Sequence, residues 1–373
     1  MNSHSPLRTA GVILLHTGPP VAEHERSVHR HLAQDIAEVL GIPMLGIREA
    51  GDPVPQSGSY LIPDATLVGP QSAVRSPADL YGGVVSHPFM AGKAISHPLI
   101  DTHAVAPVGW TEEFMRVAGA AVLPGFSAFD RSDALRAGQQ LMEQGPVRAK
   151  RVCGRAGRGQ QTVRTERDLQ RWLDSLEDED IHLHGVVLEQ NLEQVRTYSV
   201  GQLQVGAYLI SYFGQQRLTI ANDGAAVYGG SDLYLVRGNY LALQQQFNAA
   251  LPREAISKAQ RYEQAAEVAF PSFIASRRNC DVAMGVSSSG QRSVGVLEQS
   301  WRIGGASSAE IHALRAFAAN PMLQRIRASS WEIYGDSPTI PDHSRILFRG
   351  DDPDTGPLTK GVTLRPWQPP ANP

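Results

Sequence analysis

The chain has 373 residues, of which 42% are hydrophobic and 19% are charged, and it carries a formal net charge of -3 at pH 7. A chain of this length and apolar content is expected to form a globular protein of two or three lobes with a sizeable buried core. The weak net charge, without a clustered basic surface, argues against a nucleic-acid partner.

The first third of the chain alternates between strand-like and helix-like segments. A buried strand, an amphipathic helix that Gly41 and Pro43 end, and two further strands are predicted. Their ranges are residues 11–15, 28–40, 44–47 and 60–62. This alternation predicts a Rossmann-like α/β lobe with a parallel sheet over residues 1–105. The segment 82–110 is rich in Gly, His and Pro, so we expect it to be irregular and to mark the lobe boundary.

Helices and strands continue to alternate over residues 106–190, which we expect to form a small, lid-bearing subdomain. The predicted elements are a helix, a strand, a second helix and another strand. They cover residues 133–142, 147–152, 166–176 and 185–189. Thr165 and Asp168 have the spacing of a capping box at the start of the second helix. The apolar residues of that helix recur on one face, which predicts that it packs on a core.

Residues 191–336 are predicted to form a larger subdomain that is rich in strands over 195–220. The elements that follow are a helix over about 252–269, a hairpin over 281–302 and a helix after residue 307. Ser307 and Glu310 have the spacing of a capping box for that last helix. The final segment, 337–373, is rich in Pro and Asp, and we expect it to be an extended tail.

Cysteine usage and the N-terminus set the expected environment. The two cysteines, Cys153 and Cys280, are too few and too far apart for a disulfide scaffold or a zinc site. The apolar run at 12–15 is too short for a signal peptide or a membrane span. We therefore expect a soluble cytoplasmic protein without a membrane partner.

The predicted hairpin carries two carboxylates. A two-residue turn at Ser289-Gly290 would place Asp281 opposite Glu298. Along the second strand, Glu298, Ser300 and Arg302 would then share one face. Like charges directly opposite each other destabilise a sheet, and a Mg²⁺ ion between them would reverse that effect. An ion pair between one carboxylate and a nearby arginine would fit the same pattern, so both interpretations stay open.

Two glycine-rich stretches offer backbone N–H groups to anions. Gly304 and Gly305 precede the helix after Ser307, which indicates an anion site or an ordinary capped helix. The loop 154–160 follows the strand that carries Lys150, and it lacks both the P-loop and the dinucleotide fingerprints. Such a loop can close over phosphates with Lys150 as a point charge, or it can be an exposed turn.

The order of these pieces resembles the ATP-grasp superfamily over about residues 90–320. That superfamily has a strand lysine, a glycine-rich loop, a strand with an acidic hinge, and a late strand pair with Asp and Glu-x-Asn-x-Arg. The corresponding pieces here are Lys150, 154–160, 186–192, Asp281 and 298–302. The whole chain also resembles an uncharacterised bacterial family of this superfamily. The resemblance implies an ATP-grasp fold of mixed α/β and α+β class behind the Rossmann-like lobe.

The resemblance implies a role for each matching position. Lys150 would contact the nucleotide phosphates, and the glycine loop would form a lid over them. The loop positions are Gly154, Gly157, Arg158 and Gly159. The hinge would read adenine through its backbone, and Glu193 would meet the ribose. The hinge positions are Glu189, Gln190, Asn191 and Leu192. Asp281 and Glu298 would hold Mg²⁺, and Arg302 would stabilise a transferred phosphate or acyl phosphate.

Two positions depart from the superfamily pattern. Ser300 stands where the superfamily has an Asn metal ligand, and because a hydroxyl is a weaker ligand, a second metal is in doubt. The earlier lysine that usually contacts the nucleotide has one candidate, Lys93, which lies farther before Lys150 than expected. A solvated loop residue is the alternative interpretation of Lys93.

The leading hypothesis is therefore an ATP- and Mg²⁺-dependent ligase that activates a carboxylate as an acyl phosphate for attack by an amine. Lys150 and Arg302 would be its catalytic residues, and its substrates would be small-molecule or peptide carboxylates and amines. Residues 221–232 are a candidate acceptor loop or a surface connection. A homodimer is a further expectation. An ATP-dependent kinase or carboxylase, or a nucleotide-binding module without turnover, stays open as the alternative.

Overall fold

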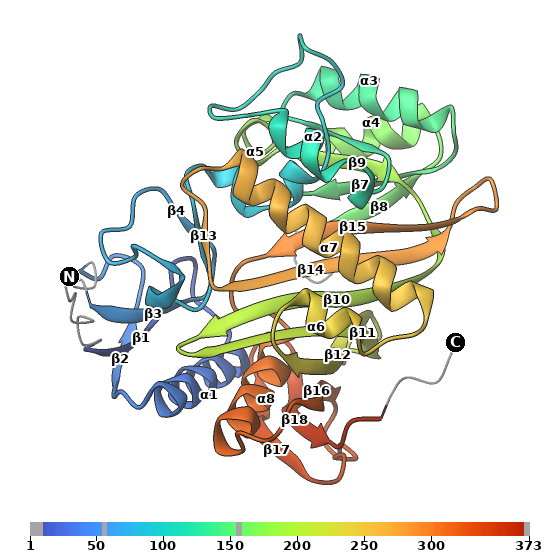
Figure 1. Cartoon of the computed structure of the whole chain (residues 1–373). Helices are drawn as coiled ribbons and strands as arrows, with labels where there is room; N and C mark the ends of the chain where they lie inside the picture. Colours follow the sequence, from blue (N-terminus) through green and yellow to red (C-terminus); the bar gives the residue numbers. More distant parts are fainter. Residues whose placement is uncertain (1–9, 54–57, 154–158, 369–373) are drawn as a thin grey trace.

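The computed structural model describes residues 10–53, 58–153 and 159–368. Over these ranges the strands form four sheets (Figure 1). A small parallel sheet forms the N-terminal lobe, a second small sheet connects it to the rest, and two antiparallel sheets form the body. No helix in the described ranges is long and apolar enough to cross a membrane.

The N-terminal lobe is a parallel α/β unit, as the alternation of segments predicted. β1 (Gly11–Leu15) pairs in parallel with both β2 (Met44–Arg48) and β3 (Ser59–Pro63). α1 (Glu23–Leu40) connects β1 to β2 and ends at Gly41, whose φ of 67° is a left-handed value that glycine adopts readily. Because the strands are parallel, the loops that follow them meet at one edge of the sheet.

Short elements connect this lobe to the body. They are β4 (Leu67–Val68), η1 (Pro77–Asp79), β5 (Gly83–Val85), η2 (Pro88–Ala91), η3 (Lys93–Ser96), α2 (Glu113–Ala118) and η4 (Gly119–Ala121). β5 lies between β4 and β13 (Ile274–Ala275) in the connecting sheet. The segment 82–110 therefore contains short helices and a strand. η3 is buried and contacts β15, β6 and β9, whereas much of 101–109 is exposed, so only the first half of this segment packs inside the molecule.

The small antiparallel sheet has the order β6-β9-β7-β8. Its strands are β6 (Gly125–Ala128), β7 (Val147–Arg151), β8 (Gln160–Val163) and β9 (Val186–Gln190). Its helices are α3 (Arg131–Met142), α4 (Glu166–Asp174) and α5 (Asp178–His184). Thr165 caps α4 by accepting a hydrogen bond from the Asp168 N–H, as the sequence predicted. The apolar face of α4 packs into the core of this subdomain.

The large antiparallel sheet has the order β15-β14-β10-β11-β12-β16-β18-β17. Its first five strands in chain order are β10 (Glu193–Val205), β11 (Tyr208–Ile220), β12 (Ala226–Arg237), β14 (Arg277–Val286) and β15 (Arg292–Ser300). β16 (Arg325–Tyr334), β17 (Ser344–Asp352) and β18 (Gly356–Arg365) complete it. The helices packed on it are α6 (Tyr240–Gln244), α7 (Ala250–Ala269) and α8 (Ser307–Ala319).

The two faces of the large sheet bury different cores, because side chains alternate along each strand. Val200 of β10 and Phe213 of β11 point to the core around α7. Leu203 and Tyr212, on the same two strands, point to the core shared by α8 and α1. The second face is therefore the one that meets the N-terminal lobe (Figure 1).

The expectation of an extended tail over 337–373 was wrong for the part that the structure describes. β17 and β18 form a hairpin, and β18 pairs with β16, so this segment is part of the large sheet. The Pro- and Asp-rich composition marks the turns of this hairpin. The Asp352 carboxylate, for example, accepts hydrogen bonds from the backbone N–H groups of Asp354 and Thr355.

Candidate active site

Two carboxylates face each other where β14 pairs with β15. Asp281 lies directly opposite Glu298 in the antiparallel ladder. Asp281 Oδ1 accepts hydrogen bonds from Gln216 Nε2 at 2.8 Å and from Asn279 Nδ2 at 3.1 Å. Desolvation, followed by the negative charge of Glu298, raises the pKa of Asp281 to about 6. A cation near the pair would favour the ionised form of this carboxyl group, because opposite charges lower the pKa of an acid.

The pairing of Asp281 with Glu298 does not come from the predicted two-residue turn. Residues 287–291 connect the strands, a longer turn than expected. From the turn, the ladder runs from Val286–Arg292 to Val282–Val296, and a bulge at Leu297 then places Asp281 opposite Glu298. The predicted turn was wrong and the predicted carboxylate pair was right, because the longer turn and the bulge shift the register in compensating directions.

Lys93 reaches the carboxylate pair from η3. Its side chain is 5% exposed, and its Nζ lies 2.7 Å from Glu298 Oε2. The interpretation of Lys93 as a solvated loop residue was therefore wrong. The alternative in which one carboxylate pairs with Arg292 was also wrong, since Arg292 contacts Glu254 at 2.9 Å and a lysine lies beside Glu298.

Lys150 lies on β7 of the small sheet and forms a buried ion pair. Its Nζ is 2.5 Å from Glu189 Oε1 on the neighbouring strand β9. The other oxygen of Glu189 is 3.2 Å from His97 Nε2. Burial raises the pKa of Glu189, but the charge of Lys150 and the hydrogen bond from His97 outweigh it and leave the pKa below its usual value. Sequence reasoning expected only the backbone of Glu189 to act and missed this side-chain contact.

The predicted hinge is the connection between the small and large sheets. β9 ends at Gln190, and β10 begins at Glu193, which is exposed. The backbone N–H groups of Gln190 and Asn191 already donate to carbonyl oxygens within the protein, at 2.8 and 3.1 Å. Those two N–H groups are therefore not available to read adenine in this conformation, and Leu192 is buried in a small apolar cluster.

Ser300 and Arg302 lie at the end of β15, and Arg277 of β14 holds this end in place. Arg277 Nη1 donates to Ser300 Oγ at 3.1 Å and to the Arg302 carbonyl oxygen at 2.7 Å. Ser300 is opposite Asn279 in the ladder, so Asn279 shares a face with the carboxylate pair. The sequence signal for Asn279 was its position two residues before Asp281 on the same strand.

The helix α8 begins differently from the predicted capping box. Glu310 does not cap the helix; its carboxylate is buried and accepts hydrogen bonds from Arg277 Nη2 at 2.6 Å and from Tyr212 Oη at 2.7 Å. Ser307 Oγ accepts from the Gly304 N–H at 3.1 Å. The capping prediction was wrong because Glu310 has a distant partner of opposite charge, which local spacing cannot reveal.

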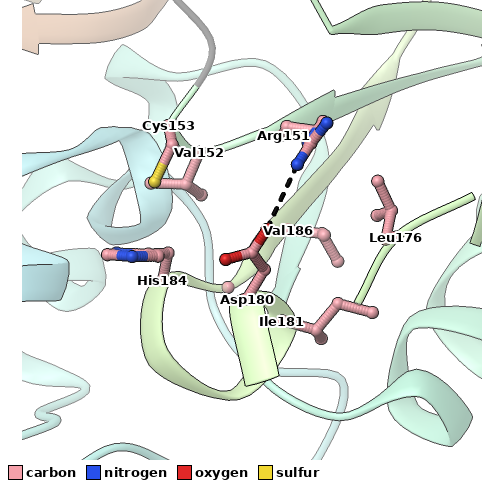
Figure 2. A pocket seen from close by; sticks show the side chains of 9 residues that line it. Arg151, Val152, Cys153, Leu176, Asp180, Ile181, His184 and Val186 are labelled. Atoms are coloured by element: carbon pink, nitrogen blue, oxygen red, sulfur yellow. Dashed lines mark hydrogen bonds and ion pairs between the residues drawn. The ribbon is translucent and has the colours of Figure 1, made fainter. Parts of the chain in front are cut away.

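The glycine loop is only partly described. Gly154, Gly157 and Arg158 lie outside the described residues, and Gly159 precedes β8 with a φ of 75°. Figure 2 shows a small hollow at the base of this loop, where Arg151 of β7 contacts Asp180 of α5 at 3.2 Å. Because Lys150 and Arg151 are consecutive in a strand, they point to opposite faces, so this hollow is not on the face that carries Lys150.

The candidate acceptor segment 221–232 forms the tip of the β11–β12 hairpin and the start of β12. The Asn222 amide donates to the carbonyl oxygens of Thr355 and Pro357 in the C-terminal hairpin. Farther along β12, Asp232 forms an ion pair with Arg217 at 2.8 Å. These contacts anchor the segment to neighbouring strands.

The residues present fit a magnesium ion that is shared with a nucleotide. Within the described ranges, no group of three or more His, Cys, Asp and Glu side chains is arranged to hold a metal alone. Mg²⁺ commonly binds through one or two carboxylates together with substrate phosphates, which is the number that Asp281 and Glu298 supply. Lys93 pairs with Glu298, whereas burial and the charge of Glu298 keep the pKa of Asp281 raised, so a further cation beside Asp281 would favour its ionised form.

Comparison with solved structures shows an ATP-grasp fold. The chain is similar to the biotin carboxylase domain of Hydrogenobacter thermophilus 2-oxoglutarate carboxylase, with a TM-score of 0.53, 14% identity, and 95% and 86% of the two chains covered. It is also similar to Campylobacter jejuni biotin carboxylase, with a TM-score of 0.53, 10% identity, and coverage of 95% and 87%. A search of curated proteins gave no match.

At these identities the likeness establishes the fold, and the family comes from a separate comparison. A family model described as "Protein of unknown function (DUF3182)" matches residues 12–362, which include the N-terminal lobe, both antiparallel sheets and most of the C-terminal hairpin. The chain therefore belongs to the DUF3182 family and has the ATP-grasp fold.

Proposed function

We propose that this protein is an ATP- and Mg²⁺-dependent ligase that activates a carboxylate as an acyl phosphate for attack by an amine. The observation that carries the proposal is the Asp281–Glu298 pair on adjacent strands of an ATP-grasp sheet. The similar structures support nucleotide use by this fold, since one is a complex with MgADP and the other a complex with β,γ-ATP.

The proposed nucleotide site draws on two lysines, the glycine loop and the hinge. Lys93 and Lys150 would donate to phosphate oxygens, and both already contact carboxylates. The loop at the end of β7 would cover the phosphates. Its proposed residues are Gly154, Gly157, Arg158 and Gly159. The hinge between the two sheets would hold the adenosine. Its proposed residues are Glu189, Gln190, Asn191, Leu192 and Glu193.

The metal would be held by Asp281 and Glu298, with Ser300 as a weaker additional ligand. When bound, Mg²⁺ would neutralise negative charge on the phosphate oxygens. Ser300 Oγ already accepts a hydrogen bond from Arg277, which favours a single ion over two. Asn279 and Gln216 would orient the Asp281 carboxylate through the hydrogen bonds that they donate to its Oδ1.

The protein would act mainly by positioning and by charge stabilisation. Lys150 would hold the transferred phosphoryl group beside the substrate carboxylate. Arg302, next to the metal strands, would stabilise the negative charge that develops on the acyl phosphate. Substrates would be small-molecule or peptide carboxylates and amines, and homodimer formation stays a prediction.

Hydroxylamine trapping tests this proposal, because hydroxylamine converts an acyl phosphate into a hydroxamate that is measured by its iron colour. The full chain is incubated with ATP, Mg²⁺, hydroxylamine and a panel of amino acids and dicarboxylic acids. We expect hydroxamate formation that requires both ATP and one class of carboxylate. Glu298→Gln should lower the rate by about 100-fold or more, the order of loss when a transition-state electrostatic group is removed.

A matched control and two alternative outcomes make this test decisive. Glu113→Gln removes a surface carboxylate that pairs with Arg116, and it should leave the rate unchanged. Phosphate release that requires bicarbonate and gives no hydroxamate would indicate a carboxylase. Phosphorylated product that is stable to hydroxylamine would indicate a kinase, and equal rates for Glu298→Gln and wild type would contradict the metal site.

A further inference from the structure

Three polar side chains meet at the carboxyl edge of the N-terminal sheet. His16 directly follows β1, Glu49 directly follows β2 and Asp64 directly follows β3. Because the three strands are parallel, these positions come together at one edge, where α/β sheets bind their ligands. The proposed ligase site described so far uses none of them.

His16 and Glu49 form a hydrogen-bonded dyad. His16 Nδ1 lies 3.3 Å from each carboxylate oxygen of Glu49. Arg26 Nη2 donates to the same carboxylate at 2.5 Å, and this hydrogen bond is the main reason that the pKa of Glu49 is lowered. An ionised carboxylate only accepts hydrogen bonds, so His16 Nδ1 must carry the proton. In the neutral ring, Nε2 then presents a lone pair.

That lone pair has no partner among the described residues. The His16 side chain is only 1% exposed, and its Nε2 is buried without a hydrogen bond. His29 Nδ1 of α1 is likewise buried and without a partner within the described ranges, and the two rings are 5.9 Å apart. Buried polar atoms are nearly always hydrogen-bonded, so two such nitrogens on neighbouring rings point to a ligand. The loop at 17–20, next to His16, is exposed.

This edge faces the end of β15, where the proposed chemistry takes place. Asp64 Oδ1 accepts from both the backbone N–H and the hydroxyl of Thr17, at 2.9 Å each, which closes the loop after β1 onto β3. Thr66 Oγ1 donates to the Trp301 carbonyl oxygen at 3.4 Å. Desolvation is the main cause that lowers the pKa of His29 to about 4, and the charge of Arg302 contributes. His29 is therefore neutral at pH 7 and within electrostatic reach of Arg302.

We propose that His16 is the general base of the ligase, with Glu49 as its positioning residue, and that this edge binds the amine substrate. The proposal rests on the proposed ligase function. A lone pair on His16 Nε2 needs an N–H or O–H donor, and an amine supplies one. The order carboxylate, imidazole Nδ1, free Nε2 is the arrangement by which enzymes orient a histidine base.

Amide formation joins the amine nitrogen to the acyl carbon and releases inorganic phosphate. The neutral amine nitrogen attacks the carbonyl carbon of the acyl phosphate, and a C–N bond forms. The bond between that carbon and the phosphate oxygen breaks, and inorganic phosphate leaves with the electron pair. The proton that the nitrogen loses passes to His16 Nε2. The imidazolium that results is stabilised by Glu49, and it later releases the proton to water.

Comparison of two nucleophiles isolates this step. Hydroxylamine is largely unprotonated at neutral pH and attacks acyl phosphates without a base, whereas ordinary amines need the proton removed. The full chain is assayed with ATP, Mg²⁺ and the carboxylate panel, and with either hydroxylamine or the common amino acids as nucleophile. His16→Asn keeps a donor for Glu49 and loses the base nitrogen, and His182→Asn, on the exposed face of α5, is the matched control.

We expect His16→Asn to keep the wild-type rate of hydroxamate formation and to lose amide formation by about 100- to 10,000-fold, the usual contribution of a general base. The control should change neither rate. Amide formation at the wild-type rate would overturn the proposal. Equal losses of hydroxamate and amide would also overturn it, because they indicate a structural role. Failure of wild type to form any hydroxamate would refute the ligase function itself, which is a distinguishable result.

A spectroscopic readout tests the dyad without turnover. Long-range ¹H–¹⁵N spectra of the full chain with labelled histidine distinguish the two neutral tautomers, and the His16 signal is assigned by its absence in His16→Asn. The proposal requires the Nδ1–H tautomer in wild type and a change in its population in Glu49→Gln. The Nε2–H tautomer in wild type, or an unchanged signal in Glu49→Gln, would overturn the dyad.

Discussion

Lys150 and Glu189 form a buried ion pair at the proposed nucleotide site. Their side chains are 4% and 2% exposed, and their charged atoms are 2.5 Å apart. Removing two charges from water costs free energy that their attraction only partly returns, so such pairs are weak evidence for a purely stabilising role. A phosphate group near Lys150 would supply a second anionic partner, which makes nucleotide binding the function that best explains the pair.

We predict that Lys150→Met weakens ATP binding by about 10- to 150-fold, since a hydrogen bond to a charged group is worth about 1.5–3 kcal/mol. The single variant also leaves Glu189 buried with only His97 as a partner. The double variant Lys150→Met with Glu189→Gln removes both charges and should restore the melting temperature but not ATP affinity. Calorimetry and melting curves of the three proteins would show this, and full recovery of affinity in the double variant would contradict the role of Lys150.

At the residue scale, the sequence predicts which side chains share one face of a strand, because side chains alternate between the two faces. Asp281 was correctly placed opposite Glu298, although the longer turn and the bulge at Leu297, whose effects on the register cancel, were not predicted. Contacts between distant segments could not be predicted in the same way. Lys93 at Glu298 and Arg277 at Glu310 join segments that have no shared local pattern. The contact between Glu49 and His16 depends on the pairing of parallel strands, so it could not be predicted from the sequence around either residue.

At the scale of elements, α7 packs on the large sheet with a carboxyl group in its buried face. Glu263 is 3% exposed and accepts a hydrogen bond from Tyr240 Oη at 2.6 Å. Burial is the main cause that raises its pKa from 4.5 to about 7. A raised pKa means that the folded state binds this proton more tightly than the unfolded state. Glu263 therefore contributes stability that is fully present below pH 4.5 and is lost as the pH rises through about 7.

We predict that the free energy of unfolding of wild type falls between pH 5 and pH 8 by about 3 kcal/mol more than that of Glu263→Gln. The amide keeps an acceptor for Tyr240 and has no proton to lose. Glu254→Gln, on the exposed face of the same helix, should follow wild type. Urea unfolding of the three proteins at both values gives the comparison. A parallel pH dependence of wild type and Glu263→Gln would show that Glu263 does not titrate in this range.

The elements that the sequence located well have strong local patterns. β1, α3 and the capped helix α4 followed from apolar periodicity and end signals. The C-terminal hairpin was missed because Pro and Asp suggested an unstructured tail, whereas here they form its turns. The start of α8 was misread because the same Ser and Glu spacing can serve a cap or a buried ion pair.

At the scale of the molecule, the two antiparallel sheets and the N-terminal lobe bring residues of separate segments to the end of β15. Lys93 reaches β15 from the connecting segment, Arg277 joins β15 to α8, and Thr66 joins the N-terminal lobe to Trp301. The order of motifs along the sequence predicted the ATP-grasp fold. That order follows the order in which the strands of the two sheets occur in the chain. The substrate could not be predicted, since one fold supports many reactions.

The measurement that tests the central claim most directly is a calorimetric titration of ATP into the full chain, with and without Mg²⁺. Wild type should bind ATP in a saturable, Mg²⁺-dependent manner, and Glu298→Gln should bind it about 10-fold or more weakly. The variant should stay folded, because the amide still offers an oxygen to Lys93 Nζ, which lies 2.7 Å from Glu298 Oε2. Absence of ATP binding by wild type, or equal Mg²⁺-dependent affinity in Glu298→Gln, would contradict the assignment of this carboxylate pair as the metal site.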